Sequence, residues 1–364
     1  MNIATQIESF RNEGLRFNNI PSGELVCHSP SNIALVKYWG KIDAQIPCNP
    51  SISFTLNNAI SKTKLNYQPS ESGKFELEFL FENQRNPKFE EKIMKFFQSI
   101  SEVFPFINQL KFSFESENTF PHSAGIASSA SGMSAIAMIL CELEKQHFGT
   151  LQEKEEYLQK ASFIARLGSG SACRSVYPEL ASWGEIKGFD NTSNLYATQM
   201  NAEVDNVFAT YHDDILIVDK KEKSVSSRAG HDLMNGNPYA EPRFQQGKEN
   251  VVKIIDIMKA GDLDAFNSIV ESEALTLHAM MMTSNPYFLL MRPNTVKIIE
   301  KIFAYRNDTK LPVCFTLDAG PNIHLLYPDS IKMEIKTFIE AELRPLTYEN
   351  TIIEDHVGQG SKII

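Results

Sequence analysis

Alternating apolar and polar residues predict several strands in the first third of the chain. Such alternation places one face of each strand in a core and leaves the other face toward water. The predicted strands of this kind are residues 51–56, 62–68, 74–81 and 110–116. We expect 62–68 and 74–81 to pair antiparallel. Residues 24–40 are also predicted to be mostly extended, with a turn at Ser29-Pro30.

Helical spacing of apolar residues dominates the later parts of the chain. The predicted helices are residues 91–100, 131–149, 153–168, 242–261, 262–282, 295–308 and 331–343. Residues 213–219 are predicted to be a buried strand, and 311–320 a strand that enters a turn before its hairpin partner at 322–328. Groups of strands and groups of helices follow each other without regular alternation, which favours an α+β fold.

This pattern divides the chain into a leader and two lobes. Residues 1–23 form an amphipathic leader that ends at Pro21-Ser22-Gly23. A length of 364 residues suits two or three structural units. We place a boundary near residue 205, so that 24–205 is an N-terminal lobe and 206–364 a C-terminal lobe. No feature of the sequence indicates what the leader does.

The composition indicates that the chain can bury a large core and that acidic residues outnumber basic ones. Apolar residues make up 42% of the chain and charged residues 22%, as in ordinary globular proteins. The formal net charge of −10 argues against non-specific binding to nucleic acid, which requires a positive field. A basic pocket for a small anionic substrate is compatible with this charge.

The cysteines and the hydropathy of the chain predict a cytoplasmic location. The five cysteines are scattered and form no Cys-x-x-Cys pair, as expected of reduced thiols in the cytosol. No apolar run reaches the ~18 residues of a membrane span, and charges interrupt the N-terminal segment too early for a signal peptide. We therefore expect neither a membrane contact nor a nucleic-acid partner.

Small residues dominate the segment 121–130, PHSAGIASSA, directly before a predicted helix. A loop of Gly, Ala and Ser lets an anion approach the backbone, and the free N–H groups and dipole of a helix start attract negative charge. The segment predicts a phosphate site, although it lacks the Gly-Lys-Ser/Thr ending of a Walker A loop. The same composition also suits a tightly packed helix start.

Four further segments carry candidate chemistry. The segment 168–174, GSGSACR, ends in Arg174, which can hold a carboxylate or phosphate by two parallel hydrogen bonds unless it is a plain surface arginine. The segment 32–41, NIALVKYWGK, sets two lysines around an aromatic pair, and 226–231, SSRAGH, sets an arginine beside hydroxyls. Asp318, in FTLDAGPN, ends an apolar strand, where a carboxylate either caps a turn or serves as an acid or base.

Five motifs in this order resemble those of the diphosphomevalonate decarboxylase family. They are NIALVKYWGK, PHSAGIASSASG, GSGSACRS, SSRAG and FTLDAGPN. The second is also similar to the phosphate loop of the wider superfamily of homoserine, mevalonate and galactose kinases. The resemblance runs from about residue 25 to the final VGQGSKII. It implies an N-terminal lobe similar to ribosomal protein S5 domain 2, a ferredoxin-like C-terminal lobe, and an active site in the cleft between them.

The resemblance implies an ATP- and Mg²⁺-dependent conversion of mevalonate 5-diphosphate to isopentenyl diphosphate, ADP, phosphate and CO₂, in the mevalonate route of isoprenoid synthesis. The tertiary 3-hydroxyl attacks the γ-phosphoryl group, phosphate then leaves, and the carboxylate departs as CO₂. By resemblance, Asp318 orients this hydroxyl and accepts its proton, while Arg174 holds the substrate carboxylate. Lys37 and Asn32 are expected near the transferred phosphoryl group.

The resemblance also implies two sets of binding residues. Those expected around the substrate are Ala34, Tyr38, Lys41, Ser169, Gly170, Ser171, Arg174, Ser227, Arg228 and Ala319. Those expected around the ATP phosphates are Pro121, Ser123, Ala124, Gly125, Ile126, Ala127, Ser128 and Ser129. The motifs identify no metal ligands. They do not fix the oligomeric state, although a homodimer is common among relatives.

The chain departs from the family pattern at several positions. His122 stands where the family often has threonine, Pro50 replaces a serine, and His231 replaces a methionine. His278 aligns with a family histidine, and we expect it to pack rather than to react. None of these departures touches the residues assigned to the reaction itself.

Two alternative functions stay open at this point. A relative that phosphorylates the 3-hydroxyl of mevalonate without decarboxylation, or a phosphomevalonate decarboxylase, would share these loops, and release of CO₂ together with ADP sets a decarboxylase apart from a kinase. A non-catalytic ligand-binding homologue would be expected to lack the acid–base residue or the loop serines. Both are present here.

Overall fold

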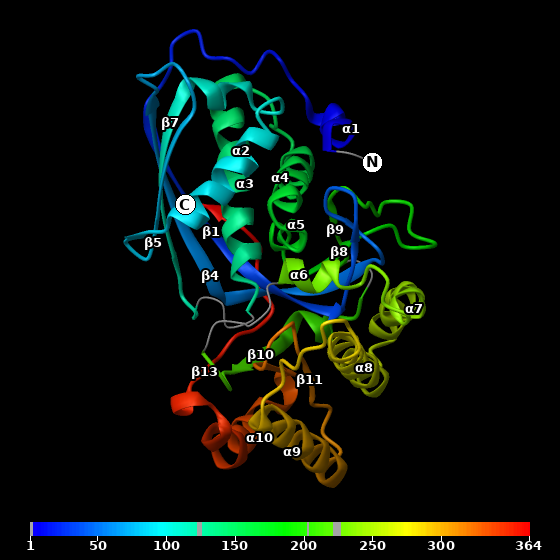
Figure 1. Cartoon of the computed structure of the whole chain (residues 1–364). Helices are drawn as coiled ribbons and strands as arrows, with labels where there is room; N and C mark the ends of the chain where they lie inside the picture. Colours follow the sequence, from blue (N-terminus) through cyan, green and yellow to red (C-terminus); the bar gives the residue numbers. More distant parts are fainter. Residues whose placement is uncertain (1–2, 122–125, 202–203, 221–226) are drawn as a thin grey trace.

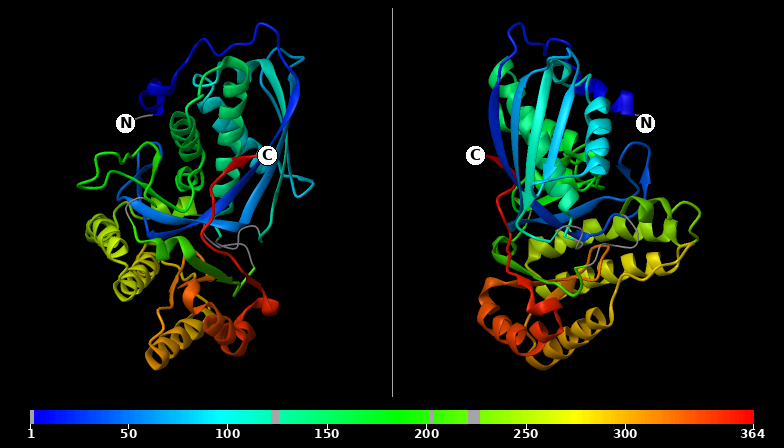
Figure 2. Two further views of the ribbon diagram at one scale, coloured as in Figure 1. Left: turned by 180° about the vertical axis from the view of Figure 1, so that it is seen from behind. Right: turned by 60° about the vertical axis from the view of Figure 1, so that its left-hand side comes forward.

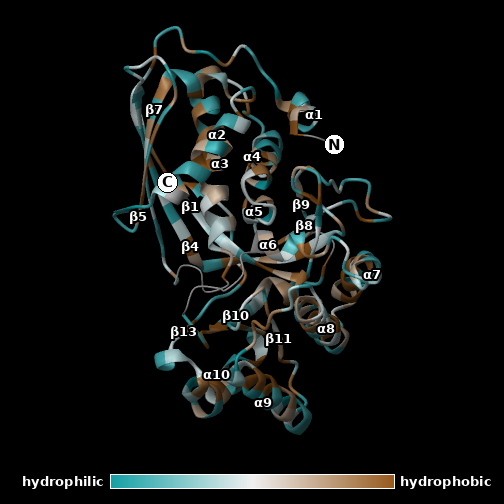
Figure 3. Cartoon of the chain, in the orientation of Figure 1, coloured by the Kyte–Doolittle hydropathy of each residue, from teal (hydrophilic) through white to brown (hydrophobic). Residues whose placement is uncertain are grey.

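Two separate sheets, each packed against helices, organise the molecule into two lobes (Figure 1). The computed structural model describes residues 3–121, 126–201, 204–220 and 227–364. Strands and helices occur in groups along the chain, and the predicted α+β class with two lobes is confirmed. In Figure 3, hydrophobic and hydrophilic colouring alternates along many elements, as one-sided packing requires.

The larger sheet has eight strands within the described residues and takes up most of the first half of the chain. They are β1 (Gly23–Val36), β4 (Ser51–Pro69), β5 (Glu76–Phe81), β6 (Gln84–Arg85), β7 (Leu110–Asn118), β8 (Leu180–Trp183), β9 (Ala197–Gln199) and β14 (Lys362–Ile363). The order is β14-β1-β4-β7-β5-β6, and β8 pairs with the first residues of β4 and with β9. Buried and more exposed residues alternate along β7, so one face of the sheet packs inward.

Four helices cover this inner face, as two views of the ribbon show (Figures 1 and 2). They are α2 (Pro87–Ser99), α3 (Ser128–Phe148), α4 (Lys154–Gly168) and α5 (Ala172–Ser175). The core between the sheet and the helices is rich in phenylalanine, and the rings of Phe97 and Phe112 meet edge to face with centroids 5.7 Å apart. The helix α3 is largely buried, which explains its small and apolar residues.

The smaller sheet has the order β11-β12-β10-β13, with every pair antiparallel. Its strands are β10 (Tyr211–Leu216), β11 (Cys314–Thr316), β12 (Ile323–Pro328) and β13 (Ile352–Ile353), and the longer helices around it are α7 (Ala240–Ala260), α8 (Leu263–Met282), α9 (Pro293–Thr309) and α10 (Lys332–Phe338). Numbered along the chain, the strands lie in the order fourth, first, third, second. Helices separate the first strand from the second and the third from the fourth, which confirms the ferredoxin-like topology.

The structure corrects three expectations about strands. β1 continues through Ser29-Pro30, where a turn was expected, and takes up the irregularity as a register shift against β4. Residues 51–56 and 62–68 belong to one strand of 19 residues, β4. β5 pairs parallel with β7 instead of antiparallel with 62–68, because β7 itself occupies that edge of β4.

Three short elements lie between the two sheets or at their margin. They are the strands β2 (Lys41–Ile42) and β3 (Ile46–Pro47), which form a small hairpin, and the helix α6 (Ser227–Asp232). β2 begins with the last residue of the 32–41 motif, and α6 contains residues 227–231 of the 226–231 motif.

The leader packs against the lobe of the larger sheet. Its helix α1 (Ile3–Ile7) presents Gln6, whose Oε1 accepts a hydrogen bond from Arg166 Nη2 at 2.7 Å. Phe10 stacks on Phe163 with ring centroids 4.4 Å apart, and Leu15 is 2% exposed. The leader therefore covers apolar surface of α4 and contributes to the core.

The end of the chain returns to the larger sheet. β14 pairs antiparallel with β1, with Cys27 opposite Ile363. Shortly before it, the Asp355 carboxylate accepts hydrogen bonds from the backbone N–H groups of Asn57, Asn58 and Ala59 in β4. Both views in Figure 2 place the C-terminus beside this sheet, so the chain enters and leaves the molecule on the same lobe.

All five cysteines are free thiols, and four of them are buried, which agrees with the expectation of reduced cysteines. Within the described ranges, no helix has both the length and the apolar character that crossing a membrane requires.

Replacing Leu15 by alanine should lower the free energy of unfolding by about 2–5 kcal/mol, because it opens a cavity under the leader. Urea denaturation followed by circular dichroism measures this loss. Glu13→Ala, at an exposed position of the same segment, is the matched control and should change little. Equal stability of Leu15→Ala and Glu13→Ala would contradict the packing of the leader.

Candidate active site

An ion pair between the two lobes lies at the centre of the candidate site. Lys37 directly follows β1 of the larger sheet, and Asp318 lies shortly after β11 of the smaller sheet. Lys37 Nζ lies 2.9 Å from Asp318 Oδ1, and the two side chains are 2% and 27% exposed. The ammonium is thus buried, whereas the carboxylate is partly exposed.

A second layer of buried charge holds Lys37 in place. Its backbone N–H donates to Glu273 Oε2 at 2.8 Å, and its carbonyl accepts from Arg243 Nη2 at 2.9 Å. Arg243 also pairs with Glu273, whose other oxygen accepts from Asn250 Nδ2 at 2.6 Å. Burial lowers the pKa of Lys37, and the adjacent Asp318 carboxylate opposes this effect. Helices α7 and α8 therefore fix the end of β1.

Arg174 lies on α5 and is 1% exposed, so it is no ordinary surface arginine. Its Nε and Nη2 donate to Asn32 Oδ1 at 3.3 and 3.2 Å. Asn32 Nδ2 in turn donates to Ser175 Oγ at 2.8 Å. The remaining Nη1 is buried and has no hydrogen-bond partner among the described residues. A buried guanidinium N–H without an acceptor is costly, so this atom suits an anionic ligand.

Tyr38 lies between two cations of the site. Arg174 and Lys41 lie over its ring, 5.6 and 5.7 Å from the centroid. The ring also meets Trp183 edge to face at 4.9 Å. Burial raises the pKa of Tyr38 to about 12, although Arg174 opposes the shift, so the phenol is protonated at neutral pH. A protonated phenol can donate a hydrogen bond to an anion.

The two small-residue loops meet at their serines. Ser129 Oγ, in the first turn of α3, lies 3.3 Å from Ser169 Oγ, which directly follows α4. Ala127 precedes α3 in the left-handed conformation, with φ of 46°. The carbonyl of Ile126 accepts from Ser31 Oγ at 2.6 Å, which ties this loop to β1. The start of a 21-residue helix therefore faces the same region as the Arg174 loop.

Most of the predicted site residues share this region of the molecule. On β1 or between β1 and the hairpin are Asn32, Ala34, Lys37, Tyr38 and Lys41. At the start of α3 are Ile126, Ala127, Ser128 and Ser129, and between α4 and the end of α5 are Ser169, Gly170, Ser171 and Arg174. After β11 are Asp318 and Ala319. Pro121 is the last described residue before the phosphate loop. Ser227 and Arg228 form the first turn of α6. The predicted nucleotide contacts Ser123, Ala124 and Gly125, and the departure at His122, lie outside the described residues.

Two family models match the chain one after the other. The diphosphomevalonate decarboxylase-like N-terminal domain matches residues 29–195, and the mevalonate 5-diphosphate decarboxylase C-terminal domain matches residues 214–362. The diphosphomevalonate decarboxylase of Debaryomyces hansenii is 30% identical over 321 residues, which cover 82% of this chain and 78% of that protein. The chain belongs to the diphosphomevalonate decarboxylase family.

Further members of the decarboxylase family agree with this assignment. The human diphosphomevalonate decarboxylase is 27% identical over 337 residues, with 83% of this chain and 76% of that protein covered. The mevalonate diphosphate decarboxylase of Staphylococcus aureus is 27% identical and superposes with a TM-score of 0.78, over 95% of this chain and 98% of that chain. A structure described as "MDDEF in complex with MVAPP, AMPPCP and Magnesium" is 25% identical, with a TM-score of 0.79 over 94% and 99% of the two chains.

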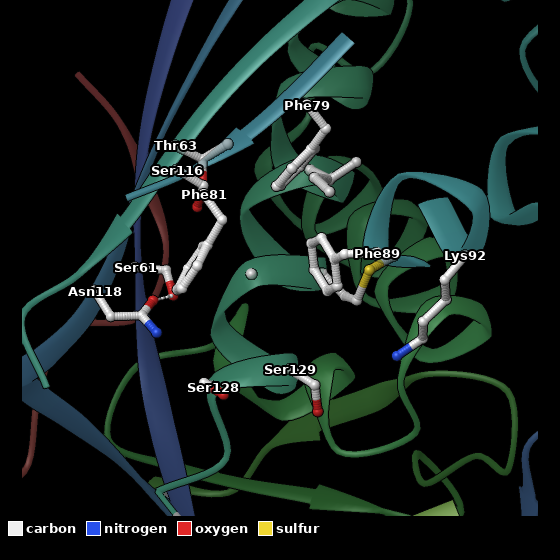
Figure 4. Close-up of a pocket in the computed structure, with 13 residues that line it drawn as sticks. Ser61, Thr63, Phe79, Phe81, Phe89, Lys92, Ser116, Asn118, Ser128 and Ser129 are labelled. Atoms are coloured by element: carbon white, nitrogen blue, oxygen red, sulfur yellow. Dashed lines mark hydrogen bonds between the residues drawn. The ribbon is translucent and has the colours of Figure 1, made fainter. Parts of the chain in front are cut away.

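A pocket that the sequence did not predict opens beside the start of α3. The centre of a water molecule can reach about 40 Å³ of it, within about 490 Å³ of space between the lining atoms that is partly open to solvent. Figure 4 shows the rings of Phe79, Phe81 and Phe89 around it, with Ser128 and Ser129 nearby. Its other lining residues are Ser61, Thr63, Lys92, Ser116, Asn118, Gly132, Met133 and Ile136. Aromatic walls with a few polar groups are typical of sites for small planar ligands. No sequence motif indicated this pocket, because its walls come from five separate elements, β4, β5, α2, β7 and α3.

Arg166 is a further residue that the sequence analysis missed. It is fully buried in α4, and burial lowers its pKa to about 10. Its Nη1 donates to the carbonyls of Ala44 and Gln45 at 2.9 and 3.1 Å, at the tip of the β2–β3 hairpin. Lys41, in the same hairpin, donates to Gln45 Oε1 at 2.6 Å. An arginine among the apolar positions of a predicted helix is the signal that could have found it.

His278 contacts the backbone of Asp318. Its Nε2 donates to the carbonyl of Asp318 at 3.1 Å, and the ring is 2% exposed, which agrees with the expected packing role. In the part of the chain that the structure describes, no three His, Cys, Asp or Glu side chains cluster as a metal site would require.

Replacing Glu273 by alanine should cost about 3–5 kcal/mol of unfolding free energy, because it leaves the Arg243 guanidinium buried without its counter-ion. Chemical denaturation measures the loss. Glu271→Ala is a control on the same helix, since Glu271 also pairs with an arginine, Arg306, but one that is 23% exposed. The assignment of Glu273 as the support of Lys37 fails if Glu271→Ala is the more destabilising of the two.

Proposed function

We propose that this chain catalyses the ATP-dependent decarboxylation of mevalonate 5-diphosphate to isopentenyl diphosphate, with release of ADP, phosphate and CO₂. The reaction proceeds through phosphorylation of the tertiary 3-hydroxyl and belongs to the mevalonate pathway of isoprenoid synthesis. One observation carries the proposal: a partly open carboxylate, Asp318, is paired with a buried lysine in the same cleft as a buried arginine that has a spare donor.

Asp318 is the general base of the phosphoryl-transfer step. Lys37 fixes the orientation of this carboxylate, which is 27% exposed. The carboxylate accepts the hydroxyl proton as the oxygen attacks the γ-phosphoryl group of ATP. Lys37 also lies where its positive charge can offset the negative charge that is transferred with the phosphoryl group.

Arg174 holds the carboxylate that later departs as CO₂. Asn32 keeps the guanidinium in one orientation through two hydrogen bonds, so the free Nη1 points at a fixed place. Once phosphate has left, positive charge develops at the tertiary carbon, and the electron pair of the C–C bond to the carboxylate forms the new double bond. An oriented carboxylate favours this fragmentation because no further reorganisation is needed.

The remaining groups bind the two polyanions. Tyr38, Lys41 and the Ser169–Ser171 loop bind the substrate diphosphate from the larger-sheet lobe. By resemblance to the family motif, Ser227 and Arg228 at the start of α6 also contribute to this site. The start of α3 receives the ATP phosphates, and the aromatic pocket beside it receives the adenine base. The loop hydroxyls would help to hold Mg²⁺, which would supply positive charge to offset that of the nucleotide phosphates.

The finer assignments of domain, location and assembly are proposals of the same kind. We infer a leader over 1–23 and lobes over 24–205 and 206–364. A cytoplasmic enzyme without nucleic-acid or membrane partners fits the net charge of −10 and the free cysteines. A homodimer is the proposed assembly, and sedimentation velocity tests it.

Incubation of the protein with ATP, Mg²⁺ and mevalonate 5-diphosphate should release ADP, phosphate and CO₂ in equal amounts. ADP without CO₂ would identify a kinase instead, and absence of turnover would refute the function. Asp318→Asn should lower kcat by about 10²–10⁴-fold with a much smaller effect on the substrate KM, because the amide oxygen can still accept a hydrogen bond from Lys37 but cannot take the substrate proton. Asp329→Asn, at an exposed carboxylate after β12, is the control. Wild-type turnover by Asp318→Asn would exclude this residue as the base.

A larger side chain in the aromatic pocket should weaken the binding of ATP but not that of mevalonate 5-diphosphate. A side chain at Gly132 would extend into open space, since a Cβ there meets no atom within 4 Å. Gly132→Leu should raise the KM for ATP by about tenfold or more and leave the KM for mevalonate 5-diphosphate unchanged. Gly132→Ala adds only a methyl group and should keep both constants while it stabilises α3 by up to about 1 kcal/mol. An unchanged KM for ATP in Gly132→Leu would show that the adenine of ATP binds elsewhere.

A further inference from the structure

A single histidine joins α6 to the segment that links β1 and β2. His231 lies in α6 and is 6% exposed. Gly40 donates its backbone N–H to His231 Nδ1 at 3.0 Å. The imidazole stacks on the ring of Tyr38, with centroids 4.9 Å apart and planes 19° apart, and packs on Trp39 at 4.4 Å. Three successive residues of one segment thus contact one imidazole ring.

The packing around this contact leaves no room for a side chain at Gly230 or Gly40. A Cβ on Gly230 would lie 2.5 Å from Trp39 Cζ2, so the glycine lets α6 touch the indole directly. Gly40 has φ of +95°, which favours glycine, and a Cβ there would lie 2.6 Å from Phe244 Cζ. A small shift of α6 would therefore break the hydrogen bond and both ring contacts together.

Both partners in this contact carry groups that the proposed function assigns to the substrate diphosphate. Tyr38 and Lys41 flank the Trp39-Gly40 pair on one side. On the other side, Ser227 and Arg228 begin the helix that contains His231. The first group belongs to the lobe of the larger sheet, whereas α6 follows β10 of the smaller sheet. A contact that fixes these two segments also fixes the distance between the two halves of the diphosphate site.

We propose that His231 is a positioning residue that docks α6 on Tyr38, Trp39 and Gly40 and so sets the geometry of the diphosphate site. The inference rests on the proposed function. The methionine that the family pattern has at this place could fill the space, but it is a weak acceptor for the Gly40 N–H.

The contact requires a neutral imidazole. Nδ1 must accept from Gly40, so the single ring proton lies on Nε2. Burial and then the positive charge of Lys41 lower the pKa of His231 well below the usual value of 6.5. The other described groups packed on the ring are the neutral phenol of Tyr38 and the indole of Trp39. Because protonation favours the undocked state, docking weakens only as the pH falls below about 6.5.

Two variants separate the hydrogen bond from the ring. His231→Phe keeps an aromatic ring but leaves the Gly40 N–H without an acceptor, and should raise the KM for mevalonate 5-diphosphate about tenfold at pH 7.5. The KM for ATP and kcat should change much less. His231→Asn places an oxygen near the position of Nδ1 and should restore a KM close to that of the wild type. His147→Phe is the matched control, because the ring of His147 packs on Phe17, outside the site.

The pH dependence of the KM for mevalonate 5-diphosphate tests the positioning role, because a residue that only stabilises the fold would not change it. In the wild type, the KM for mevalonate 5-diphosphate should rise as the pH falls from 6.5 to 5, whereas His231→Asn should lack this rise because it cannot bind the proton. Thermal melting checks that each variant is folded. If His231→Phe does not fold, the comparison of His231→Asn with the wild type across this pH range decides alone.

The outcomes distinguish failure of the proposed function from failure of the positioning role of His231. If the wild type releases neither ADP nor CO₂, the proposed function fails, and the role of His231 fails with it. If the wild type is active and the substrate KM shows the same pH dependence with and without His231, only the positioning role is overturned. A selective rise in the substrate KM of His231→Phe, reversed in His231→Asn, supports it.

Discussion

The contact on which the whole arrangement depends is the ion pair between Lys37 and Asp318. A buried ammonium needs a counter-ion, because its desolvation cost is otherwise uncompensated. Here the counter-ion comes from the other lobe, while Glu273 and Arg243 fix the backbone that carries the lysine. Separation of the lobes would therefore break this ion pair. The same constraint keeps the Asp318 carboxylate near Arg174 and Tyr38.

Features that depend on neighbouring residues could be predicted from the sequence. Gly149 and Gly261 end α3 and α7 in the left-handed conformation, as their position after long helical patterns indicates. The chemistry of Arg174 and Asp318 could be inferred because each stands in a short motif whose backbone and side chain act together. Five such motifs in order are also sufficient to recognise the family, even where identity to its members is near 30%.

Features that depend on distant residues could not be predicted. Asn57 and Asn58 interrupt the alternation of β4 and mimic a turn, yet the chain stays extended there because Asp355, almost three hundred residues later, accepts their N–H groups. The parallel pairing of β5 is set by which strand occupies the edge of β4. Likewise, Glu273 resembles any polar helix residue until the fold sets it behind Lys37.

The return of β14 to the edge of β1 makes the lobe of the smaller sheet an insertion between two strands of the larger one. The two lobes are consequently not separable fragments. A nick in the connection after β9 would leave the first piece without an edge strand and expose the unpaired backbone of β1. On its own, such a piece would have an open sheet margin that could pair with another chain, which continuity of the chain through the smaller-sheet lobe prevents.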